Sequence, residues 1–169
     1  MASTATNKQP LLVDRVFHEL EILTTNVTGN TSAPQSNLGG TNQAKKFIDC
    51  TSNDGAIVES IYCHSRSSSS TYKVNFYITT DSDFLRSENA RFIGRMTSSG
   101  TEGAIVYFSA MPTILAPVPQ VQNGASANEQ QAMLKAVYVP KGKCLWAAIE
   151  STAASISDAP VVGVQGGFY

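Results

Sequence analysis

The chain has 169 residues, of which 42% are hydrophobic and only 15% are charged, and its formal net charge is −1. This length suits a single domain with its own core, and the charge balance lacks the basic stripe with which proteins neutralise nucleic-acid phosphates. The polar N-terminus has no apolar segment of a secretory signal, and no run approaches the ~20 apolar residues that span a bilayer. We therefore expect neither a membrane nor a specific nucleic acid as a partner.

The N-terminal region, residues 1–40, is predicted to form an extended arm and loop outside a domain at residues 41–169. Its first ten residues are mostly polar, and its apolar side then switches between Phe17 and Leu20, which indicates two short extended pieces. Residues 26–42 are nearly all turn formers. An arm of this kind adds apolar side chains to a neighbour's surface or sheet edge. The expected partner-binding residues are Leu11, Leu12, Val16 and Phe17.

The rest of the chain reads as short strands separated by turns. The clearest alternation lies at residues 72–80, where Val74 and Phe76 share one side. Asp54-Gly55 is a hairpin signal, and the turn at residues 140–143 is predicted to close another hairpin. About eight to ten such strands without a long helical period predict an all-β fold, an antiparallel β-sandwich or jelly-roll-like domain.

Residues able to carry chemistry are sparse. GxSxG, HExxH and Walker sequences are absent, and Cys63 cannot pair with His64 because adjacent strand residues point to opposite faces. Asp81-Ser82-Asp83 resembles part of a calcium loop but lacks its Gly and bidentate Glu. We expect no enzyme activity, cofactor or metal. The odd set of cysteines is predicted to be buried free thiols from a reducing compartment, namely Cys50, Cys63 and Cys144.

Aromatic side chains leave a carbohydrate-binding role open, because β-sandwiches bind sugars through exposed rings. All the candidates stand inside predicted strands, where aromatic residues more often belong to the core. Trp146 lies in an apolar run that predicts burial on both faces of its strand. The candidates are Tyr62, Tyr77, Tyr107, Tyr138 and Trp146.

Several stretches resemble a known group of proteins. They are the N-terminal MASTATNKQPLLVDR, FIDCTSNDGAIVESIY, LAPVPQ, and YVPKGKCLWAAI followed by VVGVQGGFY. This pattern is similar to that of small virion structural proteins of tailed bacteriophages, particularly phages of cyanobacteria. The resemblance implies a non-enzymatic protein of the virion, made in the host cytoplasm.

The role that this resemblance favours is capsid decoration, in which a cement protein binds the major capsid protein and stabilises the head. A neck or tail structural protein and a carbohydrate-binding virion protein remain alternatives. The low charge content fits a surface covered by neighbours. We expect a homo-oligomer, with a trimer favoured because head lattices offer threefold positions.

Overall fold

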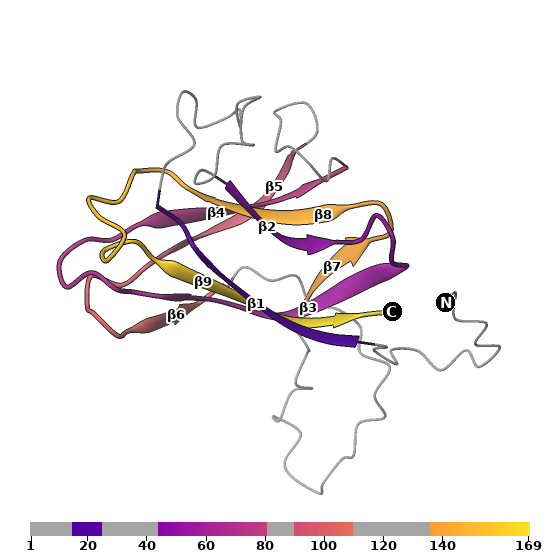
Figure 1. The fold of residues 1–169 in the computed structure, drawn as a ribbon, viewed down its shortest axis with the longest axis horizontal. Coiled ribbons are helices and arrows are strands. Elements are labelled where there is room, and N and C mark those ends of the chain that lie inside the picture. The colour runs from indigo at the N-terminus through magenta and orange to yellow at the C-terminus, as the bar shows by residue number, and fades with distance from the viewer. Residues whose placement is uncertain (1–14, 25–43, 81–89, 110–135) are drawn as a thin grey trace, which may run out of the picture.

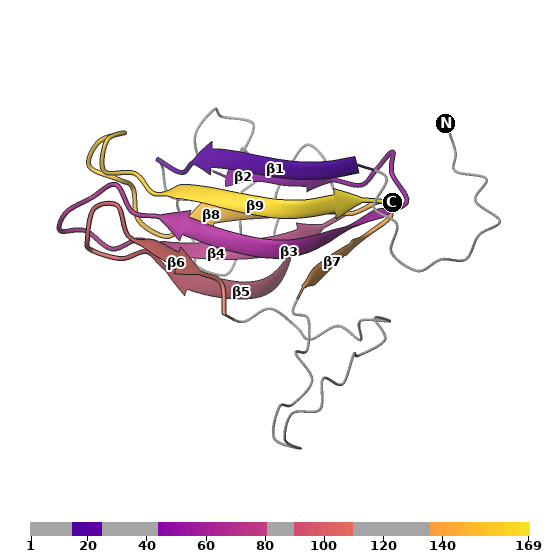
Figure 2. The ribbon, with the colours of Figure 1, turned by 90° about the horizontal axis from the view of Figure 1, so that it is seen from below.

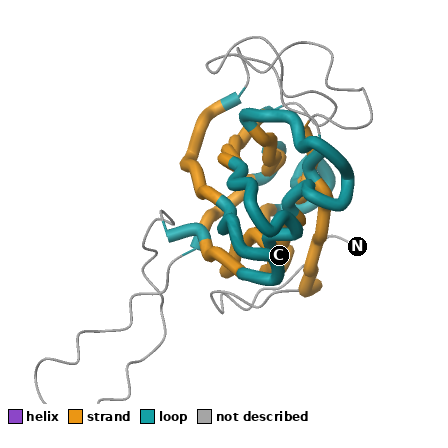
Figure 3. Tube along the Cα trace, turned by 90° about the vertical axis from the view of Figure 1, so that its left-hand side faces the viewer, coloured by secondary structure: helices purple, strands orange, loops and turns teal. Residues whose placement is uncertain are grey.

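A computed structural model of the chain describes residues 15–24, 44–80, 90–109 and 136–169. Within these ranges the fold is all-β, without a helix, and nine strands form two antiparallel sheets that face one another (Figures 1 and 2). The predicted all-β class is therefore confirmed. Seen end-on, the two layers enclose the interior of the domain (Figure 3).

The five-stranded sheet has the order β1-β9-β3-β6, and β7 pairs with another part of β3. Its strands are β1 (Arg15–Ile22), β3 (Gly55–His64), β6 (Ile105–Tyr107), β7 (Val137–Pro140) and β9 (Val161–Phe168). The four-stranded sheet has the order β2-β8-β4-β5. Its strands are β2 (Ala44–Asp49), β4 (Lys73–Thr79), β5 (Arg91–Thr97) and β8 (Cys144–Ile149).

Both predicted hairpin turns instead carry the chain from one sheet to the other. At residues 140–143, the Lys143 amide donates to the Pro140 carbonyl at 3.0 Å, and the turn joins β7 to β8 of the opposite sheet. Asp54-Gly55 likewise lies between β2 and β3, which belong to different sheets. The hairpin predictions were wrong because a turn sequence specifies a local reversal and leaves open which sheet each strand joins.

Part of the predicted N-terminal arm lies in the domain's own sheet. All eight residues of β1 pair with β9, from Arg15 opposite Phe168 to Ile22 opposite Val161. Phe17 is buried, and its ring lies 4.9 Å from that of Phe168. Residues 15–22, which were predicted to belong to the arm, therefore form a strand of the domain's own sheet.

The apparent switch of the apolar side in β1 has a simple cause. Phe17, Glu19 and Glu21 share the core-facing side, but β1 is the outermost strand of its sheet, so this side reaches the rim of the core. Glu19 is exposed there, and Glu21 forms an ion pair with Lys45 of β2 at 3.8 Å. One continuous edge strand thus replaces the two extended pieces that the pattern suggested.

The main core fills the space between the sheets. In β4, Val74 and Phe76 are fully buried while Lys73 is exposed, as the alternation predicted. Every residue of β8 is buried, and its two faces belong to different clusters. Leu145, Ala147 and Ile149 face the main core, whereas the other side of β8 carries a smaller cluster of Ala44, Cys144, Trp146 and Ala148.

Trp146 is therefore buried as predicted, with 5% of its surface exposed, but it lies outside the main core. Its indole Nε1 has no hydrogen-bond partner among the described residues. Such a donor carries a desolvation cost of about 1–3 kcal/mol.

The backbone of β3 and the ring of Phe17 both lie so close to Gly166, near the C-terminus, that this position has no room for a side chain. A Cβ atom at this position would lie 2.0 Å from the carbonyl oxygen of Ile57 and 2.9 Å from the Phe17 ring. The register of β3 and β9 shifts beside this point, between Val58 and Ser60. Only a residue without a side chain lets the bulged backbone of β3 and the ring from β1 meet over β9.

Candidate interaction surface

Exposed apolar side chains gather on the side of the five-stranded sheet that points away from the core, here named the outer face. Figure 2 looks onto this sheet, with the four-stranded sheet behind it. Seven large hydrophobic residues are exposed in the described ranges, and five of them stand on the outer face. These five are Val16, Leu20, Ile105, Tyr107 and Tyr138.

Strand pairing fixes the direction of these side chains. Tyr107 and Ile105 pair with Tyr62 and His64 of β3, which alternate with core residues, so all four point outward. Tyr138 stands between two buried valines of β7 and pairs with Ile57. The outer face therefore extends across the sheet from β1 to β6 and β7.

A row of rings crosses the middle of the outer face. A hydrogen bond of 2.7 Å joins His18 Nε2 of β1 to the hydroxyl of Tyr62 on β3, and the ring of Tyr107 lies 6.2 Å beyond that of Tyr62. Between β1 and β3 runs β9, where a Cβ at Gly163 would lie 2.3 Å from the Tyr62 ring. Gly163 thus lets Tyr62 lie across β9 and tie the edge strand to β3.

Charge is scarce on the outer face. The outward positions of the described strands hold no Asp, Glu, Lys or Arg, except that Glu59 is exposed at the bulge of β3. The centre carries Gln165, which is exposed and pairs with His18 on one side and Ser60 on the other. Charge depletion with exposed tyrosine is typical of the buried centre of protein interfaces.

The outer side of the four-stranded sheet carries both charged and apolar side chains, because the cluster around Trp146 and the exposed ring of Phe92 lie there beside an ion-pair network. Glu150 forms ion pairs with Arg95 and, at 3.8 Å, with Lys73. Arg95 also donates to the side-chain oxygen of the buried Asn75 at 2.8 Å. The two outer surfaces of the domain therefore differ in charge, since among the described residues only the four-stranded sheet carries such an ion-pair network.

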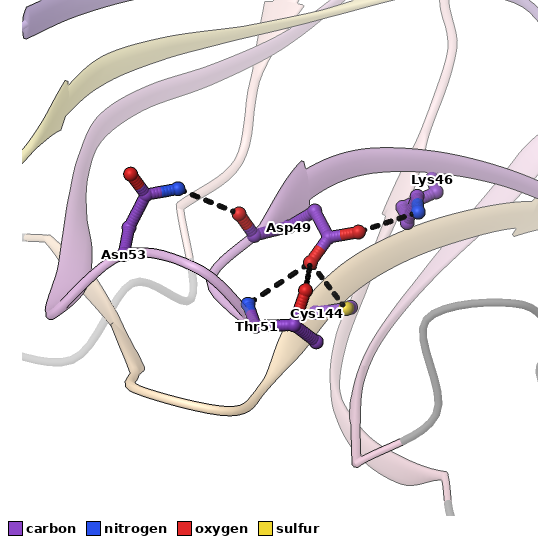
Figure 4. A network of polar contacts seen from close by, with 5 residues as sticks. All are labelled: Lys46, Asp49, Thr51, Asn53 and Cys144. Carbon is purple, nitrogen blue, oxygen red and sulfur yellow. Dashed lines mark hydrogen bonds and ion pairs between the residues drawn. The ribbon is translucent and has the colours of Figure 1, made fainter.

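The densest polar cluster surrounds Asp49 at the end of β2 (Figure 4). Its carboxylate accepts hydrogen bonds from Lys46 Nζ and Thr51 Oγ1, both at 2.6 Å, and from the Thr51 amide at 3.0 Å. Asn53 donates to the Asp49 carbonyl at 3.1 Å. Burial opposes ionisation, but these donors together hold the pKa of Asp49 well below its ordinary value. The cluster fixes the turn that leads to β3.

The thiol beside this cluster stays protonated. Cys144 Sγ donates to Asp49 Oδ1 at 3.5 Å, and burial, with the carboxylate's charge, raises the pKa of Cys144 to about 12. Burial raises the pKa of Cys50 to about 11 and that of Cys63 to about 12. All three cysteines are free and buried, as predicted. A thiol in this state is a poor nucleophile, since the thiolate is the reactive form.

The structure separates the predicted partner-binding residues. Val16 is 81% exposed on the outer face, whereas its neighbour Phe17 is 8% exposed and packs in the core. Phe17 therefore anchors β1 and is not available to a partner. Leu11 and Leu12 lie outside the described residues, as do Asp81 and Asp83 of the calcium-like stretch.

Sequence reasoning missed most of the outer face. Leu20, Ile105, Tyr107 and Tyr138 are exposed, although the tyrosines were expected in the core. The available signal was in the alternation, because Tyr138 stands between Val137 and Val139. Two apolar neighbours on the buried side imply that the ring between them points outward.

Among the described residues, no three His, Cys, Asp or Glu side chains group into a possible metal site. The same part of the chain contains no helix with the length and apolar character needed to cross a membrane. No protein-family model, curated protein or solved structure matches the chain.

Proposed function

We propose that this chain is a non-enzymatic structural protein of a tailed-phage virion, with a jelly-roll domain that packs its outer face against a neighbouring protein. The strand order supports the jelly roll. Apart from β7, successive strands fall mostly in alternate sheets, and the first and last strands lie side by side, giving β1-β9-β3-β6 opposite β2-β8-β4-β5. Jelly rolls recur in viral capsid proteins and lectins.

The observation that carries the proposal is the exposed, nearly uncharged outer face. Val16 and Tyr107, at its two margins, are 81% and 66% exposed. Large apolar areas on a soluble domain mark contacts with other molecules, and depletion of charge favours burial in an interface. The similarity of the chain's terminal stretches to phage virion proteins supports placing that contact in a particle. The free thiols support synthesis in the reducing cytoplasm of the host.

Within the virion, the proposed role is capsid decoration, with the major capsid protein as a binding partner. A protein that binds only the assembled shell stabilises it by mass action. Particles that lack it should assemble normally but release DNA at a lower temperature. Quantitative mass spectrometry of purified particles should give a copy number comparable to that of the major capsid protein.

The same measurement separates the alternatives. A copy number of only about a dozen, all at one vertex, matches a ring-shaped neck or tail component and refutes decoration. Complete absence of the chain from purified particles refutes the virion proposal itself.

A carbohydrate-binding virion protein is the second candidate, and one observation favours it. The rings of Tyr107 and Tyr138 are exposed on the outer face, and the polar side chains of His18 and Gln165 lie on the same face, on β1 and β9. Exposed rings with hydrogen-bonding neighbours can hold a sugar. A glycan array probed with the purified chain tests this role, and binding that a Tyr107→Ala substitution abolishes would establish it.

A further inference from the structure

The edge of the five-stranded sheet at β1 is protected against strand addition. Glu19 is exposed on the core-facing side of this outermost strand, and a strand added beyond β1 would bury its carboxylate. Glu21, also core-facing, is held by Lys45 of the other sheet. Inward-pointing charges on edge strands are a known protection against edge-to-edge pairing. Strand addition at the β1 edge is therefore disfavoured.

The outer face is compatible with an identical copy of itself. In a contact between two identical faces, a charged side chain that lies near the symmetry axis meets the same charge on the other copy. The central outward position is the neutral Gln165, and the exposed carboxylate of Glu59 is the one acidic group beside it in the described strands. Among the described strands, stacking two such faces therefore brings like charges together at one residue only, Glu59.

The two margins of the outer face also complement one another. Leu20 on β1 and Tyr107 on β6 lie in one cross-strand row, because both are in register with the pair Gly163–Tyr62. A twofold axis parallel to the strands places β1 of one copy over β6 of the other. Leu20 of each copy then covers the exposed ring of Tyr107 of the other copy.

The available area reaches that of the smaller specific interfaces. The sheet has four strands side by side, and β1 is eight residues long. With strands about 4.8 Å apart and a rise of about 3.3 Å per residue, each face covers roughly 500 Å². Two faces together cover about 1,000 Å², the lower size of specific protein interfaces.

We propose that a second copy of this chain occupies the outer face, so that two five-stranded sheets stack across a twofold axis. A contact in which the same surface is used by both partners closes at two copies. The basic unit is thus a dimer rather than the trimer expected from the sequence. The inference rests on the proposed packing role of this face, and names the neighbour.

The test uses purified full-length chain in sedimentation equilibrium over about 1–100 μM, a range that brackets micromolar dissociation constants. Wild type should behave as a dimer. Gln165→Glu keeps the shape of the side chain but brings two like charges together, and should raise the dissociation constant more than about 100-fold. Leu20→Glu should act in the same direction, because it buries a charge against the ring of Tyr107. The matched control is Ile156→Glu, because Ile156 is 65% exposed outside the outer face.

Mixing the variants identifies the partner as a second copy. An equimolar mixture of the Gln165→Glu and Gln165→Lys chains should regain dimer, because opposite charges then meet near the axis. A wild-type monomer at 100 μM, with folding confirmed by circular dichroism, overturns the inference. The inference is also overturned if the charged substitutions at Gln165 and Leu20 leave the dissociation constant unchanged, or if the mixture stays monomeric.

Failure of this inference and failure of the proposed function are separable. A monomeric chain found in purified particles leaves the virion role standing, with the capsid protein on the outer face. A dimeric chain absent from particles refutes the virion role and leaves the dimer intact.

Discussion

Replacing Gly166 with alanine tests how closely β1, β9 and β3 pack in the five-stranded sheet. The new Cβ would lie 2.0 Å from the carbonyl oxygen of Ile57, whereas real Cβ atoms are essentially never closer than 3.0 Å to such neighbours. The oxygen belongs to the backbone of β3, so β3 and β9 must separate by about 1 Å or more to restore an ordinary contact. The Phe17 ring, 2.9 Å away, must move as well.

Overpacking of this kind costs about 1–3 kcal/mol, and each ladder hydrogen bond weakened by the separation adds about 1 kcal/mol. We expect Gly166→Ala to lower the free energy of unfolding by about 3–5 kcal/mol, a large share of the 5–15 kcal/mol typical of a domain. At about 2–4 °C per kcal/mol, the melting temperature should fall by roughly 6–20 °C. Urea unfolding with an unchanged m-value would confirm that stability alone has changed.

Two other glycines serve as comparisons. At Gly163 the clash involves the far end of the Tyr62 side chain, which can swing away, so Gly163→Ala should cost only about 1 kcal/mol through loss of the bond to His18. At Gly103 no atom of the described residues lies within 4 Å of the new Cβ, but φ is +80°, so Gly103→Ala reports the backbone cost alone, about 1–2 kcal/mol. If Gly166→Ala destabilises no more than Gly103→Ala, the close approach of β3 to β9 is refuted.

Three further predictions concern Trp146, Asp49 and the cysteines. Trp146→Ala should lower the free energy of unfolding by about 3–5 kcal/mol, whereas Trp146→Phe should lower it by less than about 1.5 kcal/mol because it removes an unpaired buried donor. Melting curves followed by circular dichroism compare the two variants, and equal losses of stability would contradict this prediction. Because the pKa of Asp49 is depressed below 3.8, its ionised form stabilises the fold fully above about pH 5, so the stability difference between wild type and Asp49→Asn should shrink as the pH falls below 3.8; a constant difference down to pH 2 would count against the cluster. Cys50, Cys63 and Cys144, whose burial raises each pKa to about 11 or 12, should react with a thiol reagent at pH 8 only after denaturation; rapid labelling of the native chain would show that burial to be wrong.

Local patterns predicted the local structure well. The alternation at residues 72–80 identified the buried side of β4, and the apolar run around Trp146 identified a strand buried on both faces. These signals depend only on side-chain period and burial, which neighbouring residues in the chain determine. These signals could not predict which strands pair, because paired strands such as β1 and β9 lie at opposite ends of the described chain.

The same limit explains the errors at the candidate surface. The pattern predicted two extended pieces in place of one edge strand because Glu19 and Glu21 lie on the core-facing side of β1. The sequence does not say where the core ends. Val16 and Phe17 are adjacent apolar residues, and a strand separates such neighbours to opposite faces. Which of them faces the core depends on the register with β9, and that register is a long-range property.

The position of β9 has a consequence for biosynthesis. The last of the described strands, β9, is the neighbour of both β1 and β3, so the five-stranded sheet stays open until residues 161–168 leave the ribosome. At about 5–20 residues per second, β1 waits for roughly 7–30 s without its partner. During that time its apolar side chains Val16, Phe17 and Leu20 are protected from other nascent chains only by the charges between them. The five-stranded sheet therefore forms only after residues 161–168 are made, and a chain that ends before Val161 lacks the strand that joins β1 to β3.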